Sequence, residues 1–167
     1  NIKLLRKIVG RKIFIIEDSA QSHFSSSCHD CNNTDHSSCF KSEKSHKYAD
    51  LSCYSFYPAK NLGAYGDGGL VEVNKTHLYK KLLSLRNLGS TKKNRHLIIG
   101  KNSRLDNLQS VVLKSKLGSV LNFNAKRRKI AEYYDKHLNS INGIKTTKTN
   151  EGSSRHLYVI RVRNRDK

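Results

Sequence analysis

Apolar side chains recur at helical spacing in four segments of the chain. Near the start, Ile2, Leu5 and Val9 fall on one helix face, and Gly10 suits a helix end. The same spacing predicts three further helices, over 76–87, 105–117 and 130–138. Each predicted helix has one apolar face to bury against another layer of structure.

Short apolar runs between these helices predict β-strands. The run over 12–16 is continuously apolar after its first residue, as expected of a strand buried on both faces of a parallel sheet. Strand character returns over 51–56, 70–73 and 157–162. Because strands alternate with helices, the pattern indicates an α/β layered domain.

Two polar stretches interrupt the periodic pattern. About residues 22–47, the chain is rich in Ser, Cys and His and lacks apolar periodicity, so we predict an inserted loop. A second polar stretch, over 143–154, is predicted to be a linker. We therefore expect a large domain over 1–142, and over 143–167 a linker and the start of a smaller unit.

Length, charge and hydropathy limit the classes of function that this chain can have. The chain has 167 residues, and none of its apolar runs approaches the ~20 residues that a membrane span needs. The formal net charge is +19, but Lys and Arg are scattered along the chain, which favours a solvated basic surface over a nucleic-acid site. Such a charge could favour a phosphate-bearing small substrate. We expect a cytoplasmic protein without membrane partners, since no signal-peptide layout is visible.

Asp18 and Lys60 are candidates for catalysis because each follows a predicted strand. A lysine in such a place can act as a nucleophile towards carbonyls, and a carboxylate buried there needs a cationic partner. Pyridoxal phosphate is a cofactor that uses both an imine-forming lysine and a carboxylate facing its pyridine nitrogen. The alternative, a surface lysine and a capping aspartate, is favoured by spacing alone.

A series of ordered motifs resembles the nucleotide-sugar aminotransferases of the DegT/DnrJ/StrS family. The central motif, over 55–69, reads SFYPAKNLGAYGDGG and contains Lys60. The other motifs follow the family order and cover most of the chain outside the polar loop: 16–21, 85–90, 100–109, 124–131 and 156–160. Several motifs in the same order are far more specific than a single motif.

The resemblance implies a fold, a cofactor and a reaction. The fold would be the large domain of a fold-type I pyridoxal-phosphate transferase, α/β with a mixed, mostly parallel sheet and flanking helices, followed by the start of a small α+β domain. The cofactor would be pyridoxal 5'-phosphate, and the reaction would move an amino group from an amino acid, expected to be glutamate, to a keto sugar nucleotide. Lys60 would form the internal aldimine and then carry the proton, and Asp18 would keep the pyridine nitrogen protonated.

The resemblance also implies roles for five further residues. Gln21 would lie near the ring hydroxyl of the cofactor, and Ala20 would pack on the ring face. Ser55 would bind the cofactor phosphate. Asn102 would reach the phosphate of the neighbouring subunit's cofactor, which implies a homodimer with shared active sites. His156 would line the substrate pocket.

The two ends of the sequence predict a piece of a longer protein. The chain begins with Asn1, contains no Met and stops inside the strand predicted over 157–162. The resemblance assigns further cofactor contacts and much of the substrate pocket to a preceding segment. We therefore expect the 167 residues alone to be inactive.

A compact group of zinc-ligand residue types supports an alternative. Cys28, Cys31, His36 and Cys39 approach the spacing of a zinc knuckle, and with the positive charge they suggest a nucleic-acid-binding segment. Knuckles, however, place four residues before the last cysteine, and the stretch lacks the usual glycine and aromatic residues. We prefer a cysteine-containing loop without metal, and we expect Cys53 to pack within a strand.

Overall fold

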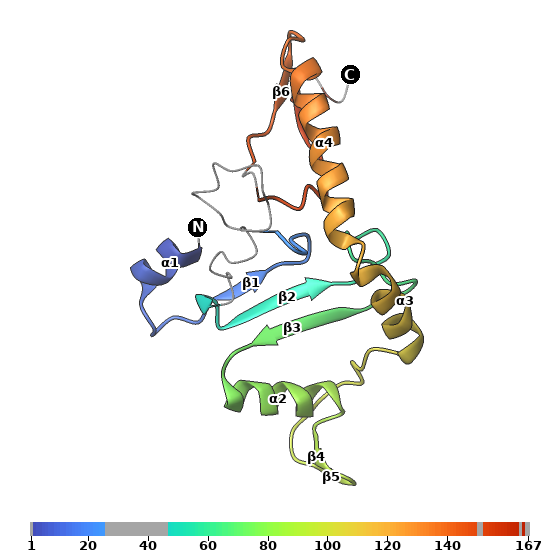
Figure 1. The fold of residues 1–167 in the computed structure, drawn as a ribbon. Helices are drawn as coiled ribbons and strands as arrows, with labels where there is room; N and C mark the ends of the chain where they lie inside the picture. The colour runs from blue at the N-terminus through green and yellow to red at the C-terminus, as the bar shows by residue number, and fades with distance from the viewer. Residues whose placement is uncertain (1, 26–46, 150–151, 164, 166–167) are drawn as a thin grey trace.

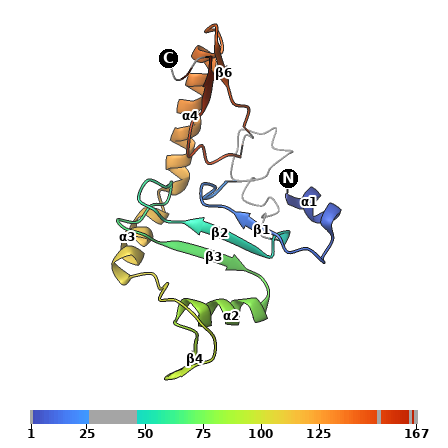
Figure 2. The same ribbon diagram turned by 180° about the vertical axis from the view of Figure 1, so that it is seen from behind.

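The computed structural model describes residues 2–25, 47–149, 152–163 and 165. A small sheet lies at its centre, two helices lie towards the end of the sheet where β2 finishes, and a β-ribbon lies beside the far part of the longest helix (Figure 1). The view from behind shows the same arrangement (Figure 2).

The central sheet has the strand order β1-β2-β3. β1 (Ile16–Asp18) pairs in parallel with β2 (Leu51–Ser55), and β2 pairs antiparallel with β3 (Gly69–Val73). The described sheet is therefore mixed. Because β1 and β2 run in the same direction, their carboxyl ends meet at one edge of the sheet, where open α/β sheets bind ligands.

Four helices occur within the described residues, and all four were predicted. α1 (Ile2–Val9) and α2 (Thr76–Arg86) match the predicted ranges closely, and α3 (Asn107–Leu117) begins slightly later than predicted. α4 (Val120–Leu138) begins well before residue 130. The prediction missed this start because one of the first buried positions of the helix is the polar Asn124, which hides the apolar period. None of the described helices combines the length and the apolar character that a membrane crossing requires.

Two short ribbons complete the described elements. β4 (Ser90–Lys92) pairs with β5 (Arg95–His96), and β6 (Ile144–Thr146) pairs antiparallel with β7 (Ile160–Val162). β6 lies inside the stretch predicted to be a linker, and it gives the last predicted strand a partner. The sequence analysis did not predict β6, because its pairing with β7 joins segments that are distant in sequence. The division at residue 142 stays a prediction.

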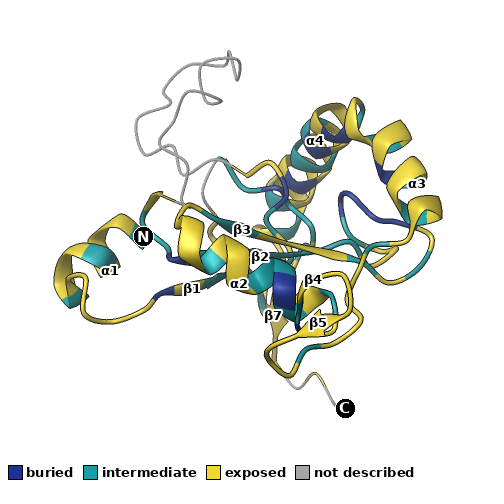
Figure 3. Cartoon of the chain, turned by 90° about the horizontal axis from the view of Figure 1, so that it is seen from below, coloured by how far each residue is buried: buried dark blue, intermediate teal, exposed yellow. Residues whose placement is uncertain are grey.

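The strand predicted over 12–16 is shifted and less buried than expected. β1 begins only at Ile16, whose side chain is 65% exposed. Ile13 and Phe14, earlier in the run, are 57% and 60% exposed. Among the described residues, β1 pairs with β2 alone, so most of these side chains remain at the surface (Figure 3). Only Ile15 of the run is buried.

The buried apolar core lies beneath the loop that carries Lys60. Leu62 and Ala64 of this loop pack with Leu113 of α3 and Val120 of α4, and Phe56 and Leu105 cover the cluster. Lys116 of α3 also donates from Nζ to the Gly63 carbonyl at 2.7 Å. The loop after β2 is therefore anchored to α3 and α4 by apolar packing and a hydrogen bond.

Candidate active site

The parallel pairing of β1 and β2 brings Asp18 and Ser55 to one edge of the sheet. Asp18 pairs with Cys53, and Ser55 follows two residues later on the same face of β2. Standard strand spacing puts the Cα atoms of Asp18 and Ser55 about 8 Å apart. The backbone amide of Ser19 donates to the Cys53 carbonyl at 2.8 Å, which extends the ladder past the end of β1.

Asp18 is solvated rather than paired with a cation. Its side chain is exposed, and its Oδ1 accepts a hydrogen bond from the backbone amide of Ala20 at 3.0 Å. Within the described part of the chain, Asp18 forms no ion pair with Lys60 or another cation. Because the carboxylate is exposed in the described chain, the burial that would require a cationic partner does not apply here, and its role towards the cofactor stays a prediction.

Lys60 is presented by a tight loop that begins at Ser55. The Ser55 hydroxyl accepts from the backbone amide of Tyr57 at 3.2 Å, and the Lys60 amide donates to the Tyr57 carbonyl at 2.8 Å. The loop then folds back so closely that a Cβ on Gly63 would lie 2.3 Å from the Pro58 carbonyl oxygen. The half-exposed Lys60 side chain makes no hydrogen bond or ion pair with any described residue.

His23 is part of the site region, and the sequence analysis missed it. Its ring is 3% exposed and lies 5.8 Å from the ring of Tyr54 and 6.0 Å from that of Phe56, centroid to centroid. The backbone at Ser55 faces the imidazole, but neither ring nitrogen has a hydrogen bond of ordinary geometry. His23 lies at the start of a polar stretch without periodicity, so no sequence signal marked it as buried.

The pKa values connect His23 and His156 with Lys60. Burial is the main cause that lowers the pKa of His23, and the positive charges of His156 and Lys60 lower it further, against an opposing effect of the Ser55 backbone. Burial also lowers the pKa of His156, followed by the charges of Lys60 and Arg127. Both imidazoles therefore favour the neutral form near the lysine.

The other residues assigned by the resemblance are divided between two regions. Ala20 is half-buried and Gln21 is exposed, and they lie two and three residues after Asp18. Asn102 is exposed and lies beside Asn87, just beyond α2 and on the β3 side of the sheet, away from β1 (Figure 1). The Asn102 side chain forms no hydrogen bond within the described residues. The structure therefore brings Ala20 and Gln21 to Asp18 but leaves Asn102 apart.

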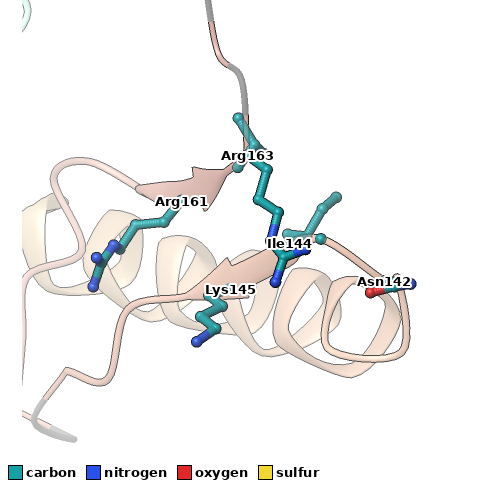
Figure 4. A pocket seen from close by; sticks show the side chains of 7 residues that line it. Asn142, Ile144, Lys145, Arg161 and Arg163 are labelled. Carbon is teal, nitrogen blue, oxygen red and sulfur yellow. The ribbon is translucent and has the colours of Figure 1, made fainter.

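Two surface hollows flank α4. The larger, of about 290 Å³, lies on the β6–β7 ribbon between side chains that include Lys145, Arg161 and Arg163 (Figure 4). It contains none of the predicted site residues. The smaller, of about 190 Å³, is lined by residues that include His156 and Arg127. The smaller hollow is therefore the one that adjoins the lysine region.

The zinc-binding alternative concerns residues outside the described ones. Cys28, Cys31, His36 and Cys39 all lie within 26–46, which the structure does not describe. Elsewhere, across 2–25, 47–149 and 152–163, no group of three or more His, Cys, Asp or Glu side chains could hold a metal ion.

Several curated relatives of this chain are named as transaminases of nucleotide-linked sugars. The chain is 37% identical over 167 residues to the dTDP-3-amino-3,6-dideoxy-alpha-D-galactopyranose transaminase of Aneurinibacillus thermoaerophilus, covering 99% of this chain and 42% of that protein. It is 44% identical over 91 residues to the UDP-N-acetyl-3-dehydro-alpha-D-glucosamine 3-aminotransferase of Acidithiobacillus ferrooxidans, covering 54% of this chain and 25% of the relative. The chain thus spans less than half the length of these relatives.

A solved structure shares the fold. The crystal structure of Streptomyces venezuelae DesV, in complex with a ketimine intermediate, superposes with a TM-score of 0.83 at 32% identity and covers 99% of this chain and 42% of that one. The predicted fold-type I architecture is thereby confirmed, and the matches give no support to the nucleic-acid alternative. A family model described as the DegT/DnrJ/EryC1/StrS aminotransferase family matches residues 1–167. The chain therefore belongs to the DegT/DnrJ/EryC1/StrS aminotransferase family.

Proposed function

We propose that the complete protein is a pyridoxal-phosphate-dependent enzyme that transfers an amino group from an amino acid to a keto sugar nucleotide. The observation that carries the proposal is the grouping of Asp18 and Ser55 at one sheet edge, with Lys60 on the loop that follows. Relatives named as transaminases of dTDP- and UDP-linked sugars support this substrate class. We propose glutamate as the amino donor.

The side chains available in this region fit the chemistry of pyridoxal 5'-phosphate. Lys60 offers an amine without a partner among the described residues, and Asp18 offers a solvated carboxylate. The Ser55 hydroxyl accepts from the Tyr57 amide, so its own proton can be donated to a phosphate oxygen. When bound, the cofactor supplies an electron sink for the carbanion formed at the substrate carbon.

Each residue then has a defined task. Lys60 would hold the aldehyde carbon of the cofactor through its amine, and once the donor amine has displaced it, Lys60 would carry a proton between the substrate carbon and that cofactor carbon. Asp18 would accept a hydrogen bond from the protonated ring nitrogen. Gln21 would contact the ring hydroxyl, and Ala20 would pack on the ring face. His156 lines the part of the pocket that holds the sugar.

We also propose a homodimer in which Asn102 completes the site of the partner subunit. The Asn102 side chain is exposed and has no hydrogen bond in the described part of its own chain. Three apolar residues, Leu97, Ile98 and Ile99, lie shortly before Asn102, and Ile99 is 97% exposed. A partner surface that covered this apolar stretch would bring Asn102 close to the partner, which supports the proposal.

Trapping at Lys60 tests the first proposal. The longest form of this protein that its source encodes, here called the full-length protein, is incubated with pyridoxal 5'-phosphate and reduced with borohydride. We expect one cofactor per chain on the peptide that contains Lys60, and less than a tenth of that label in Lys60→Ala. Lys80→Ala, at an exposed position of α2, is the matched control. Equal labelling of Lys60→Ala and wild type would remove the assigned role.

Substrate and subunit arrangement need separate experiments. A panel of amino acids, followed by mass spectrometry of dTDP- and UDP-keto sugars, identifies donor and acceptor, and we expect glutamate to be the best donor. For the dimer, inactive Lys60→Ala and inactive Asn102→Ala proteins are mixed and allowed to exchange subunits. Shared sites predict that activity reappears in the mixture. A monomeric protein, or a mixture that stays inactive despite exchange, would contradict the shared-site dimer.

The 167 residues alone are proposed to be inactive. The relatives are more than twice as long, and the resemblance assigns cofactor contacts to a segment before this chain. Expression of residues 1–167 beside the full-length protein checks this, with cofactor absorbance as the readout. A cofactor spectrum and turnover equal to those of the full-length protein would contradict the proposal.

A further inference from the structure

Asn61, the residue after Lys60, belongs to a buried hydrogen-bond relay. Asn61 is 8% exposed and Asn124 of α4 is 1% exposed. Asn61 donates from Nδ2 to Asn124 Oδ1 at 2.6 Å and to the Ser154 carbonyl at 2.8 Å. Its Oδ1 lies 2.9 Å from Nδ1 of His156. We call the side chains of Asn61, Asn124 and His156 the Asn61 relay.

Backbone carbonyls set the direction of every bond in the Asn61 relay. The carbonyl of His23 can only accept, so Asn124 must turn Nδ2 towards it, at 2.9 Å. The Oδ1 atom of Asn124 therefore faces Asn61 and needs a donor. The amide nitrogen of Asn61 supplies this donor and also satisfies the Ser154 carbonyl. Oδ1 of Asn61 is thereby left pointing at His156.

This direction determines which nitrogen of His156 carries the proton. An amide oxygen can only accept, so Nδ1 of His156 must donate to Oδ1 of Asn61. A neutral ring protonated only at Nε2 would bring two lone pairs together at 2.9 Å. Burial and the charges of Lys60 and Arg127 lower the pKa of His156, so the neutral ring is favoured. It therefore has a proton on Nδ1 and a lone pair on Nε2.

We propose that Asn61 and Asn124 are positioning residues that hold His156 in the Nδ1-protonated form, so that Nε2 accepts a hydrogen bond from a hydroxyl of the sugar substrate. The sugar contact rests on the proposed function, whereas the tautomer does not. His156 lines the hollow of about 190 Å³ beside α4, and its hydrogen bond to Asn61, the residue after Lys60, places the ring near the lysine loop. An unprotonated Nε2 can only accept a hydrogen bond, and a sugar hydroxyl can donate one.

The Asn61 relay also connects two parts of the chain that hold the lysine loop. Ser154 donates from Oγ to the Gln21 carbonyl at 2.6 Å, and Arg127 donates to the His156 carbonyl at 3.3 Å. The segment around Ser154 is thus bonded to the residues after β1, to the lysine loop and to α4. A change at Asn61 should therefore alter the His156 ring without removing every bond that places its backbone.

Nitrogen NMR of the histidine rings in the full-length protein tests the tautomer. The His156 signal is assigned by its loss in His156→Asn. At pH 7.5 we expect Nδ1 to show the shift of a protonated nitrogen and Nε2 that of an unprotonated one. In Asn61→Ala the acceptor is absent, and we expect the proton to move towards Nε2, the form preferred in water.

His96 is an internal control for this measurement. Its Nδ1 faces the Leu88 carbonyl at 3.0 Å, so it must also donate from Nδ1, yet it lies outside the Asn61 relay. Its signals should be the same in wild type and in Asn61→Ala. A wild-type His156 ring protonated at Nε2, or a His156 signal that Asn61→Ala leaves unchanged, would overturn the assignment of the relay.

Kinetics test the sugar contact separately. An asparagine at 156 can still donate to Asn61 but has no group in the place of Nε2, so His156→Asn should raise the KM for the keto sugar nucleotide about three- to tenfold. The yield of borohydride trapping and the KM for the amino donor should stay unchanged. An unchanged sugar KM would overturn the contact. Absence of any transamination by wild type would refute the proposed function, while the NMR result would still decide the relay.

Discussion

The carboxylate of Asp50 accepts a hydrogen bond from the Arg6 guanidinium at 2.6 Å, across 44 residues of sequence. The same carboxylate accepts from Lys75 Nζ at 2.5 Å and from the backbone amide of Ile15 at 2.9 Å. Asp50 is 8% exposed and directly precedes β2. This carboxylate therefore ties α1, the start of β1 and the segment before α2 to the central strand.

We predict that Asp50→Asn lowers the free energy of unfolding by roughly 2–3 kcal/mol, because charged hydrogen bonds to a buried oxygen are lost. Lys75, followed by the Ile15 amide and Arg6, holds the pKa of Asp50 well below its usual range. This stabilisation is present above the unfolded pKa of about 4 and is lost as pH falls through the lower folded value. Urea unfolding between pH 3 and 7 should show a flatter acid limb for Asp50→Asn. Lys75→Ala, at a 48% exposed side chain, should cost less.

Gly63→Ala should disturb the loop that presents Lys60. A Cβ there would lie 2.3 Å from the Pro58 carbonyl oxygen, so the backbone must move at a cost of about 1–3 kcal/mol. We expect a lower melting temperature and a reduced yield of borohydride trapping at Lys60. Gly118→Ala is the matched control, because a Cβ at Gly118 meets nothing within 4 Å. An equal effect of both substitutions would contradict the tight-loop explanation.

His23→Phe should make the protein more stable. Phenylalanine fits between the rings of Tyr54 and Phe56 and removes two ring nitrogens that lack hydrogen bonds, a gain of about 1 kcal/mol. Because burial lowers the pKa of His23, wild type should lose stability as pH falls below the unfolded value of about 6.5. This loss should shrink in His23→Phe, as urea unfolding at pH 7.5 and 5.5 would show. His77→Phe, at an exposed position of α2, should have neither effect.

Tyr158→Phe should weaken the contact between the last described segment and α4. The Tyr158 hydroxyl donates to Asp135 Oδ1 at 2.7 Å, so its loss should cost about 1 kcal/mol. Burial and Asp135 raise the pKa of Tyr158 to about 12. Its stabilisation is complete below pH 10 and is lost as pH rises towards 12. Ultraviolet titration of wild type should show a late tyrosinate step that is missing in Tyr158→Phe, while the step of Tyr54, whose pKa burial also raises, should remain.

The helices and the main strands could be predicted because their signals are local. The apolar spacing over 2–9 and 76–87 and the glycine after α1 reflect interactions within one element. The errors occurred where a distant partner decides the outcome. β6 exists through its pairing with β7, and Asn124 is buried in α4 through hydrogen bonds with His23 and Asn61.

The sequence by itself determined the family and the candidates Asp18, Ser55 and Lys60, because several short motifs in order are specific without coordinates. Only the tertiary structure decided that Asp18 is solvated, that His23 is buried without hydrogen bonds and that Asn61 connects Asn124 with His156. A motif records which side chains stand near one another along the chain. Burial and hydrogen-bond direction depend on groups brought together across 63 to 101 residues.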